Sequence, residues 1–447
     1  MSSVSIFWHR RDLRIDDNRG LAAARLSGHP VVGFFCFDRN ILDRLPTLDR
    51  RVGFIHHHIK GLTKAYAEQG GHLMTVHARP LDGLKAAMAS LNAQGLEVAE
   101  IHTNRDYAPY PVQRDAEIAA FAAESGIAFH LHEDHVILPP EAVLKDDGTP
   151  YTVFTPYSRK WHRVLESFGG APLETVDTLS EGSWASVPPE ALPLPSLESM
   201  GFDGASGDPD GWDAFSHPLE DGIIREYADQ RDTPSKRGTT RMSLHLRFGT
   251  RSIRELAQCG MAHSDKWLTE LIWREFYQAI LHHFPHSASD AFRVKYDRIP
   301  WRQDEEGFAA WCEGRTGYPL VDAGMRELNA TGFMHNRVRM VVASFLCKHL
   351  LIDWRWGERY FAEKLLDYEL ASNVGGWQWA SGSGCDAAPY FRVFNPESQM
   401  KKFDPKGTYV KHWVPEWGTS AYAAPVVGHK FARQRAIDTY KAALTEG

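Results

Sequence analysis

The sequence has 447 residues, of which 43% are hydrophobic and 24% are charged, and this is the composition of an ordinary globular protein. These values exclude a disordered chain, a collagen and a disulfide scaffold, and at about 150 residues per domain the length suggests two or three domains. The formal net charge of -7, taken as an average, argues weakly against a nucleic-acid-binding protein.

The first part of the chain alternates apolar runs with amphipathic segments. Strands are predicted at VSIFWHR, VVGFFCF, HLMTVHA, VAEIHT and IAFHLH, and helices at residues 18–26, 52–68, 81–91 and 112–124. This alternation is typical of a doubly wound parallel sheet, so we predict an α/β domain over residues 1–134. No GxGxxG or GxxxxGK[ST] motif follows the first strand, which weakens the case for hydride transfer and for P-loop phosphoryl transfer.

An acidic segment follows. Residues 166–222 contain 12 Asp or Glu and no Lys or Arg, and they are rich in Pro, Gly and Ser. Without them the rest of the chain is net positive, so the average charge does not exclude a nucleic-acid partner. We interpret residues 135–210 as a surface connector between domains, with no core of its own.

The last part of the chain has a helical pattern. Segments such as WLTELIWREFYQAILHHF and NRVRMVVASFLCKHLL repeat their apolar residues with a period near 3.6. Ten of the 14 tryptophans lie between Trp267 and Trp417. We therefore predict a mainly α-helical domain over residues 211–447.

Membrane and metal classes are disfavoured. No apolar run approaches the roughly 18 residues that a membrane span needs, and charged residues follow Met1 too closely for a secretory signal. The five cysteines lack the paired spacing of a zinc or iron–sulfur site. The run His56-His57-His58 cannot converge on one ion, because consecutive helical residues point about 100° apart. We expect a cytoplasmic protein without a metal.

Several polar residues could bind a ligand. GTTRMS at residues 238–243 precedes a helical pattern, where hydroxyls and backbone amides can hold a phosphate; the alternative is a plain helix cap. Arg339 and Asp367 could form a buried ion pair. Glu369 and Asn373 are four residues apart on one helical face and could bind a ligand together. The alternative is that this face is simply exposed to solvent.

Three tryptophans occur in unrelated helical segments, at Trp301, Trp354 and Trp377. Indole is among the few side chains that an excited redox cofactor can oxidise, so the three could form an electron-hopping chain. The alternative is that they fill a large aromatic core.

Long segments of the chain closely resemble the photolyase and cryptochrome flavoproteins. These segments are HRRDLRIDDN, WLTELIWREFY, TGYPLVDAGMRELNATGFMHNRVRMVVASFLCKHLLIDWRWGERYF and LASNVGGWQWASGSGCDAAPYFRVFNP. The chain is most similar to the class I cyclobutane pyrimidine dimer photolyases. The resemblance implies an α/β domain, a connector and a helical FAD-binding domain, and a carbon–carbon lyase that repairs DNA with blue light.

The resemblance implies a set of flavin-binding residues. Arg339 and Asp367 match an ion pair across the isoalloxazine ring, and Asn373 matches the residue whose amide faces flavin N5. Glu369 replaces the usual aspartate and is longer by one methylene. The whole set implied for FAD is Tyr227, Thr239, Thr240, Arg241, Met242, Ser243, Trp267, Arg339, Asp367, Tyr368, Glu369 and Asn373. The chain of tryptophans that photoreduces the flavin is matched, going outward, by Trp377, Trp354 and Trp301.

The resemblance also implies a substrate site, since photolyases flip a pyrimidine dimer out of the duplex. Glu270 matches the carboxyl group that binds the dimer, while Trp273 and Trp379 match its stacking wall. The whole set implied for DNA and substrate is Arg231, Glu270, Trp273, Arg274, Asn336, Arg337, Met340, Trp379, Arg392, Gln399, Lys401 and Lys402. Residues 392–412 hold five Lys or Arg against two acids, which suits phosphate contact or, alternatively, a solvated loop.

Other members of the family offer alternatives. Residues 104–115, NRDYAPYPVQRD, lack the Asn-Glu pair of folate-binding members, so an 8-hydroxydeazaflavin antenna is favoured over methenyltetrahydrofolate. Met340 occupies the position of a histidine that six-four repair needs, and Phe333 stands where Trp is common. Trp273 and Asn373 disfavour the single-strand-preferring and plant cryptochromes.

The main alternative function is a cryptochrome-like blue-light photoreceptor without repair activity. The 30 residues after Trp417 are too few for a long signalling tail, which favours repair. A nucleotide hydrolase with a helical appendage lacks any phosphate-loop motif. We expect a monomer that acts on UV-damaged DNA containing cyclobutane pyrimidine dimers.

Overall fold

The computed structural model describes residues 2–204, 212 and 221–445. The chain forms two compact units that alternate along the sequence. The first comprises Met1–Pro139, Leu165–Ser216 and Met242–Cys259, and the second Pro140–Val164, His217–Arg241 and Gly260–Gly447. Residues of the predicted 135–210 connector therefore occur in both units, and the predicted boundary after residue 210 lies outside the described residues.

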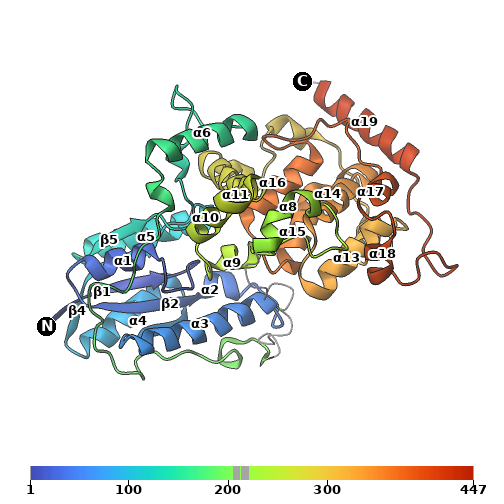
Figure 1. The fold of residues 1–447 in the computed structure, drawn as a ribbon. Helices are drawn as coiled ribbons and strands as arrows, with labels where there is room; N and C mark the ends of the chain where they lie inside the picture. Colours follow the sequence, from blue (N-terminus) through green and yellow to red (C-terminus); the bar gives the residue numbers. More distant parts are fainter. Residues whose placement is uncertain (1, 205–211, 213–220, 446–447) are drawn as a thin grey trace. The chain divides into compact units, whose positions relative to one another are not determined.

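The first unit is built on a parallel sheet, which confirms the predicted α/β fold. Its described strands are β1 (Ser2–His9), β2 (Val31–Asp38), β3 (Leu73–Ala78), β4 (Leu96–Asn104) and β5 (Ala128–His132). They are hydrogen-bonded in the order β3-β2-β1-β4-β5 (Figure 1). Most of β1 and all of β2 are buried, because helices cover both faces of a parallel sheet. Each predicted strand is present.

Helices connect these strands. They are α1 (Arg19–Leu26), α2 (Arg39–Leu42), α3 (Arg50–Glu68), α4 (Pro80–Asn92) and α5 (Pro109–Glu124). Two later helices of the chain, α9 (Ser243–Phe248) and the start of α10 (Ile253–His263), also belong to this unit but connect no strands. Local sequence explains where several begin. Asn18 and Asp49 cap α1 and α3 by accepting backbone N–H groups, and Pro80 and Pro109 stand in the first turns of α4 and α5.

The second unit is helical, as predicted. It holds most of α6 (Phe154–Ser167), then α7 (Asp221–Arg225), α8 (Tyr227–Gln230), α11 (Asp265–His283), α12 (Glu305–Cys312), α13 (Pro319–Thr331), α14 (Asn336–Ser344), α15 (Trp354–Lys364), α16 (Leu370–Ser381), α17 (Pro396–Phe403), α18 (Thr408–Trp413) and α19 (His429–Thr445). The helix predicted over NRVRMVVASFLCKHLL changes to a π-helix at Phe345–Leu350 and ends at Leu351, which has a positive φ of 57°.

The core of the second unit lies among α12, α13, α14, α15 and α16. Trp311, Trp354 and Trp377 are buried in it together with aliphatic side chains of α13 and α14. A close approach of α15 to α16 depends on Gly357, where a Cβ atom would lie 2.1 Å from Cη2 of Trp377. No helix among the described residues is long and apolar enough to cross a membrane.

Candidate functional site

The ion pair predicted between Arg339 and Asp367 is present. Arg339 lies in α14, and Asp367 lies in the loop before α16. Nη2 of Arg339 donates to the two carboxylate oxygens of Asp367 at 3.1 and 3.0 Å, and its Nε donates to the carbonyl of Met334 at 2.7 Å. Asp367 is buried, so the guanidinium is held in one orientation at the edge of the core.

Glu369 forms a second buried ion pair, which the sequence did not reveal. It is the N-cap residue of α16, and its Oε1 accepts a hydrogen bond from Nη2 of Arg274 in α11 at 3.2 Å. Its Oε2 accepts from the hydroxyl of Ser372 at 2.8 Å. Arg274 was expected at the DNA contact, and here its guanidinium links α11 to the start of α16.

The amide of Asn373 is oriented by Glu358, a residue that sequence reasoning missed. Nδ2 of Asn373 donates to the backbone carbonyl of Glu358 at 3.2 Å and to its Oε1 at 3.0 Å. The hydroxyl of Tyr368 donates to the same Oε1 at 3.4 Å. Burial raises the pKa of Glu358. Neither spacing nor composition links residue 358 to residue 373, so only the packing of α15 against α16 identifies it.

The residues predicted to bind the FAD phosphates belong to both compact units, because the boundary between the units falls after Arg241. Tyr227, Thr239, Thr240 and Arg241 belong to the second unit, whereas Met242 and Ser243 group with the first. Within the second unit, Nε1 of Trp267 donates to the Thr240 hydroxyl at 3.4 Å.

Arg241 follows Thr240 directly in the sequence. Its positive φ of 53° turns the chain, and its guanidinium lies 4.3 Å from the ring centre of Phe333. The guanidinium expected to contact the phosphates therefore packs against an aromatic ring.

One helix, α11, carries the residues expected to contact the substrate. Glu270 and Trp273 are one turn apart on it and both are partly exposed. Glu270 accepts a hydrogen bond from the guanidinium of Arg231, so these two residues form an ion pair.

Phe154 covers one face of Trp273. The two rings are stacked, with centroids 3.6 Å apart and planes 6° apart. Phe154 was missed because it lies in the predicted connector. The aromatic run YTVFTPYSRKW at residues 151–161, which precedes the acidic segment, is the signal that could have identified it.

The start of α14 carries a second group of predicted DNA-binding residues. Asn336 is exposed. Arg337 forms an ion pair with Asp232 at 2.8 Å, lies 4.4 Å from the ring centre of Phe403, and donates to Sδ of Met340 at 3.5 Å. Thus Arg337 and Met340 are held together on one surface of the helix.

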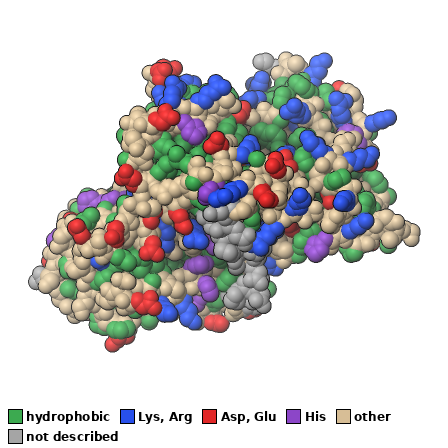
Figure 2. Space-filling model, viewed as in Figure 1, with side chains coloured by type: hydrophobic (Ala, Val, Ile, Leu, Met, Phe, Trp, Pro, Cys, Tyr) green, Lys and Arg blue, Asp and Glu red, His purple; other side chains and the backbone are tan. Residues whose placement is uncertain are grey.

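Basic residues continue onto the neighbouring segment. Lys401 and Lys402 are exposed in α17, Arg392 is exposed before it, and Gln399 and Trp379 are partly buried. On the face drawn in Figure 2, Lys and Arg side chains recur over the helical unit, where Figure 1 places α13, α17 and α18. This surface is locally positive although the chain as a whole is acidic.

The three predicted relay tryptophans belong to one apolar cluster. Trp354 and Trp377 are each 2% exposed, and Trp301 is partly exposed and packs against the same cluster. The ring of Trp377 lies 5.0 Å from that of Phe361, and the ring of Trp301 lies 5.8 Å from that of Tyr440. Two of the three tryptophans are therefore buried in the core, and Trp301 lies nearer the surface.

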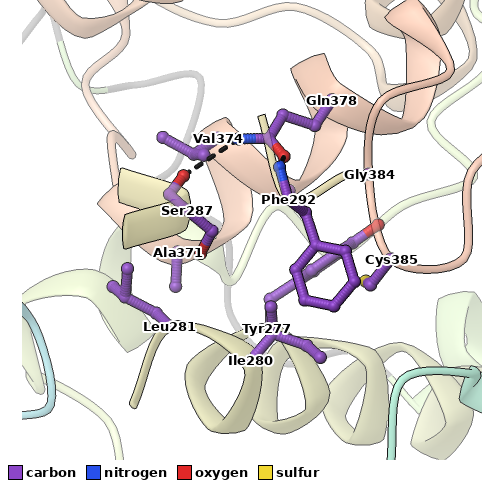
Figure 3. Close-up of a pocket in the computed structure, with 11 residues that line it drawn as sticks. Tyr277, Ile280, Leu281, Ser287, Phe292, Ala371, Val374, Gln378, Gly384 and Cys385 are labelled. Carbon is purple, nitrogen blue, oxygen red and sulfur yellow. Dashed lines mark hydrogen bonds between the residues drawn. The ribbon is translucent and has the colours of Figure 1, made fainter. Parts of the chain in front are cut away.

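A small apolar pocket lies between α11 and α16. Tyr277 of α11 and Val374 of α16 line it, and Gln378 lies at its wall (Figure 3). Nε2 of Gln378 donates to the Ser287 carbonyl at 2.9 Å, and its Oε1 accepts from the Phe292 N–H at 2.9 Å. None of the predicted FAD or DNA residues lines this pocket, so the candidate site rests on the contacts described above.

Known proteins match the whole chain. A model of DNA photolyase matches residues 5–177, and a model of the FAD binding domain of DNA photolyase matches residues 267–420. A deoxyribodipyrimidine photo-lyase of Synechococcus sp. is 37% identical over 483 residues, which cover 100% of this chain and 99% of that protein.

Solved structures agree with these matches. A bacterial class III photolyase from Agrobacterium tumefaciens superposes with a TM-score of 0.84 at 31% identity, covering 99% of this chain and 98% of that one. An archaeal photolyase from Sulfolobus tokodaii, solved with two FAD molecules, gives a TM-score of 0.80 at 32% identity over 98% of this chain and 99% of that one.

Proposed function

Because this chain belongs to the DNA photolyase family, we propose that it is a light-driven repair enzyme that splits cyclobutane pyrimidine dimers in DNA. The observation that carries the proposal is the face of α11, where Glu270 and Trp273 present a carboxylate and an indole one turn apart. A flipped-out dimer needs both an apolar wall and a hydrogen-bonding group.

The residues present fit FAD. The hydroxyls of Thr239 and Thr240 beside Arg241 suit the phosphates, and the Arg339–Asp367 ion pair and Asn373 suit a flat heterocycle with polar edges. The indole N–H of Trp377 is buried and has no acceptor among the described residues, so a ligand beside it would meet a free donor.

When bound, reduced flavin would supply, after absorbing blue light, the electron that breaks the two ring bonds of the dimer, and it would take that electron back afterwards, so that the repair has no net redox change. The protein residues hold the reactants for this step. Trp301, Trp354 and Trp377 would carry electrons inward to the cofactor site. Arg339 and Asp367 would hold the cofactor ring, and Oδ1 of Asn373, the amide atom that Glu358 does not use, would be available to accept a hydrogen bond from it.

Substrate choice follows from the partners of Glu270. Its carboxylate, oriented by Arg231, accepts hydrogen bonds from the dimer edge and steadies the charge that develops there. Met340 packs against the lesion but has no proton to give, which disfavours six-four repair, a reaction that needs proton delivery. Arg392, Lys401 and Lys402 contact phosphates of the duplex.

A second chromophore of the 8-hydroxydeazaflavin type is proposed for the first unit. A pocket lined by Arg11, Asn104 and Asp106 lies at the carboxyl ends of β1 and β4, where the strand order reverses and where such sheets bind ligands. Mass spectrometry of chromophores released by denaturation tests this: a second equivalent of FAD, as in the Sulfolobus tokodaii structure, would replace the assignment.

We also propose a cytoplasmic monomer. Five free cysteines support a reducing compartment. Size-exclusion chromatography with light scattering, with and without duplex DNA, tests the oligomeric state, and a dimer would contradict it.

Repair of defined oligonucleotides tests the main proposal. Chemically reduced enzyme and blue light should restore thymines from a cyclobutane dimer in a duplex and leave a six-four lesion unchanged. Glu270→Ala should lower the repair yield more than it lowers DNA binding, because its hydrogen bond strengthens as charge develops on the dimer. Absence of repair by the wild-type protein would contradict the proposal.

A further inference from the structure

Three histidines and a glutamate share one face of the sheet in the first unit, apart from every residue discussed above. Glu100 and His102 are two residues apart in β4, and His130 and His132 are two apart in β5, so each pair points to one side of its strand. The parallel register places His102 beside His130. The edge of the sheet formed by β4 and β5 (Figure 1) therefore carries four potential metal ligands together.

The possible ligand atoms lie close to one another. Nε2 of His102 lies 2.9 Å from Oε2 of Glu100, and the rings of His102 and His130 have centroids 4.5 Å apart. One ligand atom from each of Glu100, His102 and His130 lies within 4.8 Å of the others. Tetrahedral bonds of about 2.0–2.1 Å place ligand atoms roughly 3.3 Å apart, so side-chain rotations alone close the site.

From this geometry we propose that Glu100, His102 and His130 bind a divalent transition metal ion of the zinc class. Two imidazoles and one carboxylate are a donor set that zinc uses when it keeps a position open for water or substrate. His102 is nearly buried, while Glu100 and His130 are partly exposed, so an ion can reach the site from solvent.

His132 acts on the site through His102. Nδ1 of His102 lies 3.0 Å from Nε2 of His132, and their rings are parallel within 2°. When Nε2 of His102 binds the ion, its Nδ1–H donates to His132, which is the outer hydrogen bond that metal-binding histidines usually make.

Zinc titration tests the proposal. The purified holoprotein, stripped with a chelator and dialysed, is titrated with ZnCl₂ against a chromophoric competitor. Wild type should bind one equivalent that Glu100→Gln and His130→Gln lose, and His132→Gln should weaken it by about 10- to 100-fold. His77→Gln is the matched control: His77 lies in β3, at the other edge of the sheet, with Asp43 as its carboxylate neighbour at 4.0 Å, and binding should not change.

A second measurement keeps the test valid if a variant misfolds. Cobalt(II) added to the stripped wild-type protein should give the intense visible bands of a tetrahedral nitrogen and oxygen site, and zinc should abolish them. The proposal is overturned if folded wild type gives no such bands, if it binds zinc no more tightly than His130→Gln, or if His77→Gln weakens binding equally.

Discussion

At the scale of single residues, two acids orient groups of the predicted binding sites. Glu369 holds Arg274, and Glu358 holds the amide of Asn373. A buried acceptor that loses its donor, or a donor that loses its acceptor, costs about 1–3 kcal/mol. The site therefore depends on a residue outside the predicted FAD set, Glu358.

Glu358 provides a test of this dependence. Glu358→Ala should release the Asn373 amide and weaken FAD binding by about 5- to 10-fold, the equivalent of one hydrogen bond. Glu358→Gln should retain most of the affinity, because the amide oxygen of glutamine also accepts a hydrogen bond. Equilibrium dialysis followed by FAD fluorescence measures both, and equal losses in the two variants would contradict the role.

Trp377 is expected to be the first member of the electron relay. Trp377→Phe should abolish photoreduction of oxidised FAD but leave repair by chemically reduced enzyme largely intact, because the relay serves the cofactor and not the substrate. Transient absorption measures the first effect and oligonucleotide repair the second. Unchanged photoreduction would remove Trp377 from the relay, once the same measurement on Trp379→Phe has excluded a bypass.

At the scale of elements, the contact between α15 and α16 positions Trp377. Gly357→Ala would bring a methyl group to within 2.1 Å of the indole, so the helices must separate or the ring must move. We expect the free energy of unfolding to fall by about 1–3 kcal/mol and photoreduction to slow.

A glycine of α16 serves as the control for Gly357→Ala. A Cβ atom at Gly376 would meet no atom within 4 Å. Gly376→Ala should therefore be neutral or stabilising by up to about 1 kcal/mol, because alanine favours a helix. Denaturant titration of both variants checks the difference, and equal destabilisation would contradict the packing argument.

In the first unit, the buried carboxylate of Asp134 links two other segments of the chain, which carry Arg14 and Arg254. Burial alone would raise the pKa of Asp134, but Arg14 and Arg254 overcome it and hold this pKa below its ordinary value. Both arginines donate to Asp134 at 2.6 Å. A lowered folded-state pKa stabilises the fold above the unfolded value of about 3.9, and this stability is lost as the pH falls below it.

Asp134 therefore predicts a pH dependence of stability. The free energy of unfolding should decrease as the pH falls from about 5 toward the folded-state pKa. The Asp134→Asn variant should be less stable than the wild type at pH 7, because two arginines lose their counter-charge. Its free energy of unfolding should also change less than that of the wild type as the pH falls below about 5. Urea titrations at several pH values measure this; an unaltered pH slope in the variant would exclude Asp134 as the group responsible.

At the scale of the whole molecule, charge is distributed unevenly. The net charge is -7, yet Lys401 and Lys402 stand exposed on a locally basic surface. Three to five phosphate contacts predict a slope of about -3 to -4 for the logarithm of the affinity for dimer-containing duplex against the logarithm of salt concentration.

Charge removal tests which surface meets DNA. The double substitution Lys401→Ala and Lys402→Ala should make that slope shallower by about 2. Lys441→Ala, which changes an exposed lysine of α19 outside the proposed contact, should leave it unchanged. Fluorescence anisotropy across a salt series measures the slopes, and a salt-independent affinity would show that the basic surface does not contact phosphate.

The sequence by itself determined the elements and the class of the molecule. Apolar runs alternating with amphipathic segments predicted each strand of the sheet and most of its helices, because side-chain period reflects local geometry. Arg339 and Asp367 were predicted to pair because each lies in a segment with a strong family resemblance. The site residues of α11, α14 and α16 were likewise identified from the family resemblance of their segments.

Only the tertiary structure decided which distant side chains meet. Phe154 reaches Trp273 from a segment whose composition indicated a connector, and Glu358 orients Asn373 across two packed helices. Glu100, His102 and His130 converge because strand pairing joins residues about thirty positions apart, whereas the sequence pointed only to the consecutive histidines at residues 56–58. Local patterns record helical and strand periods; contacts between elements depend on register and packing, which no single segment encodes.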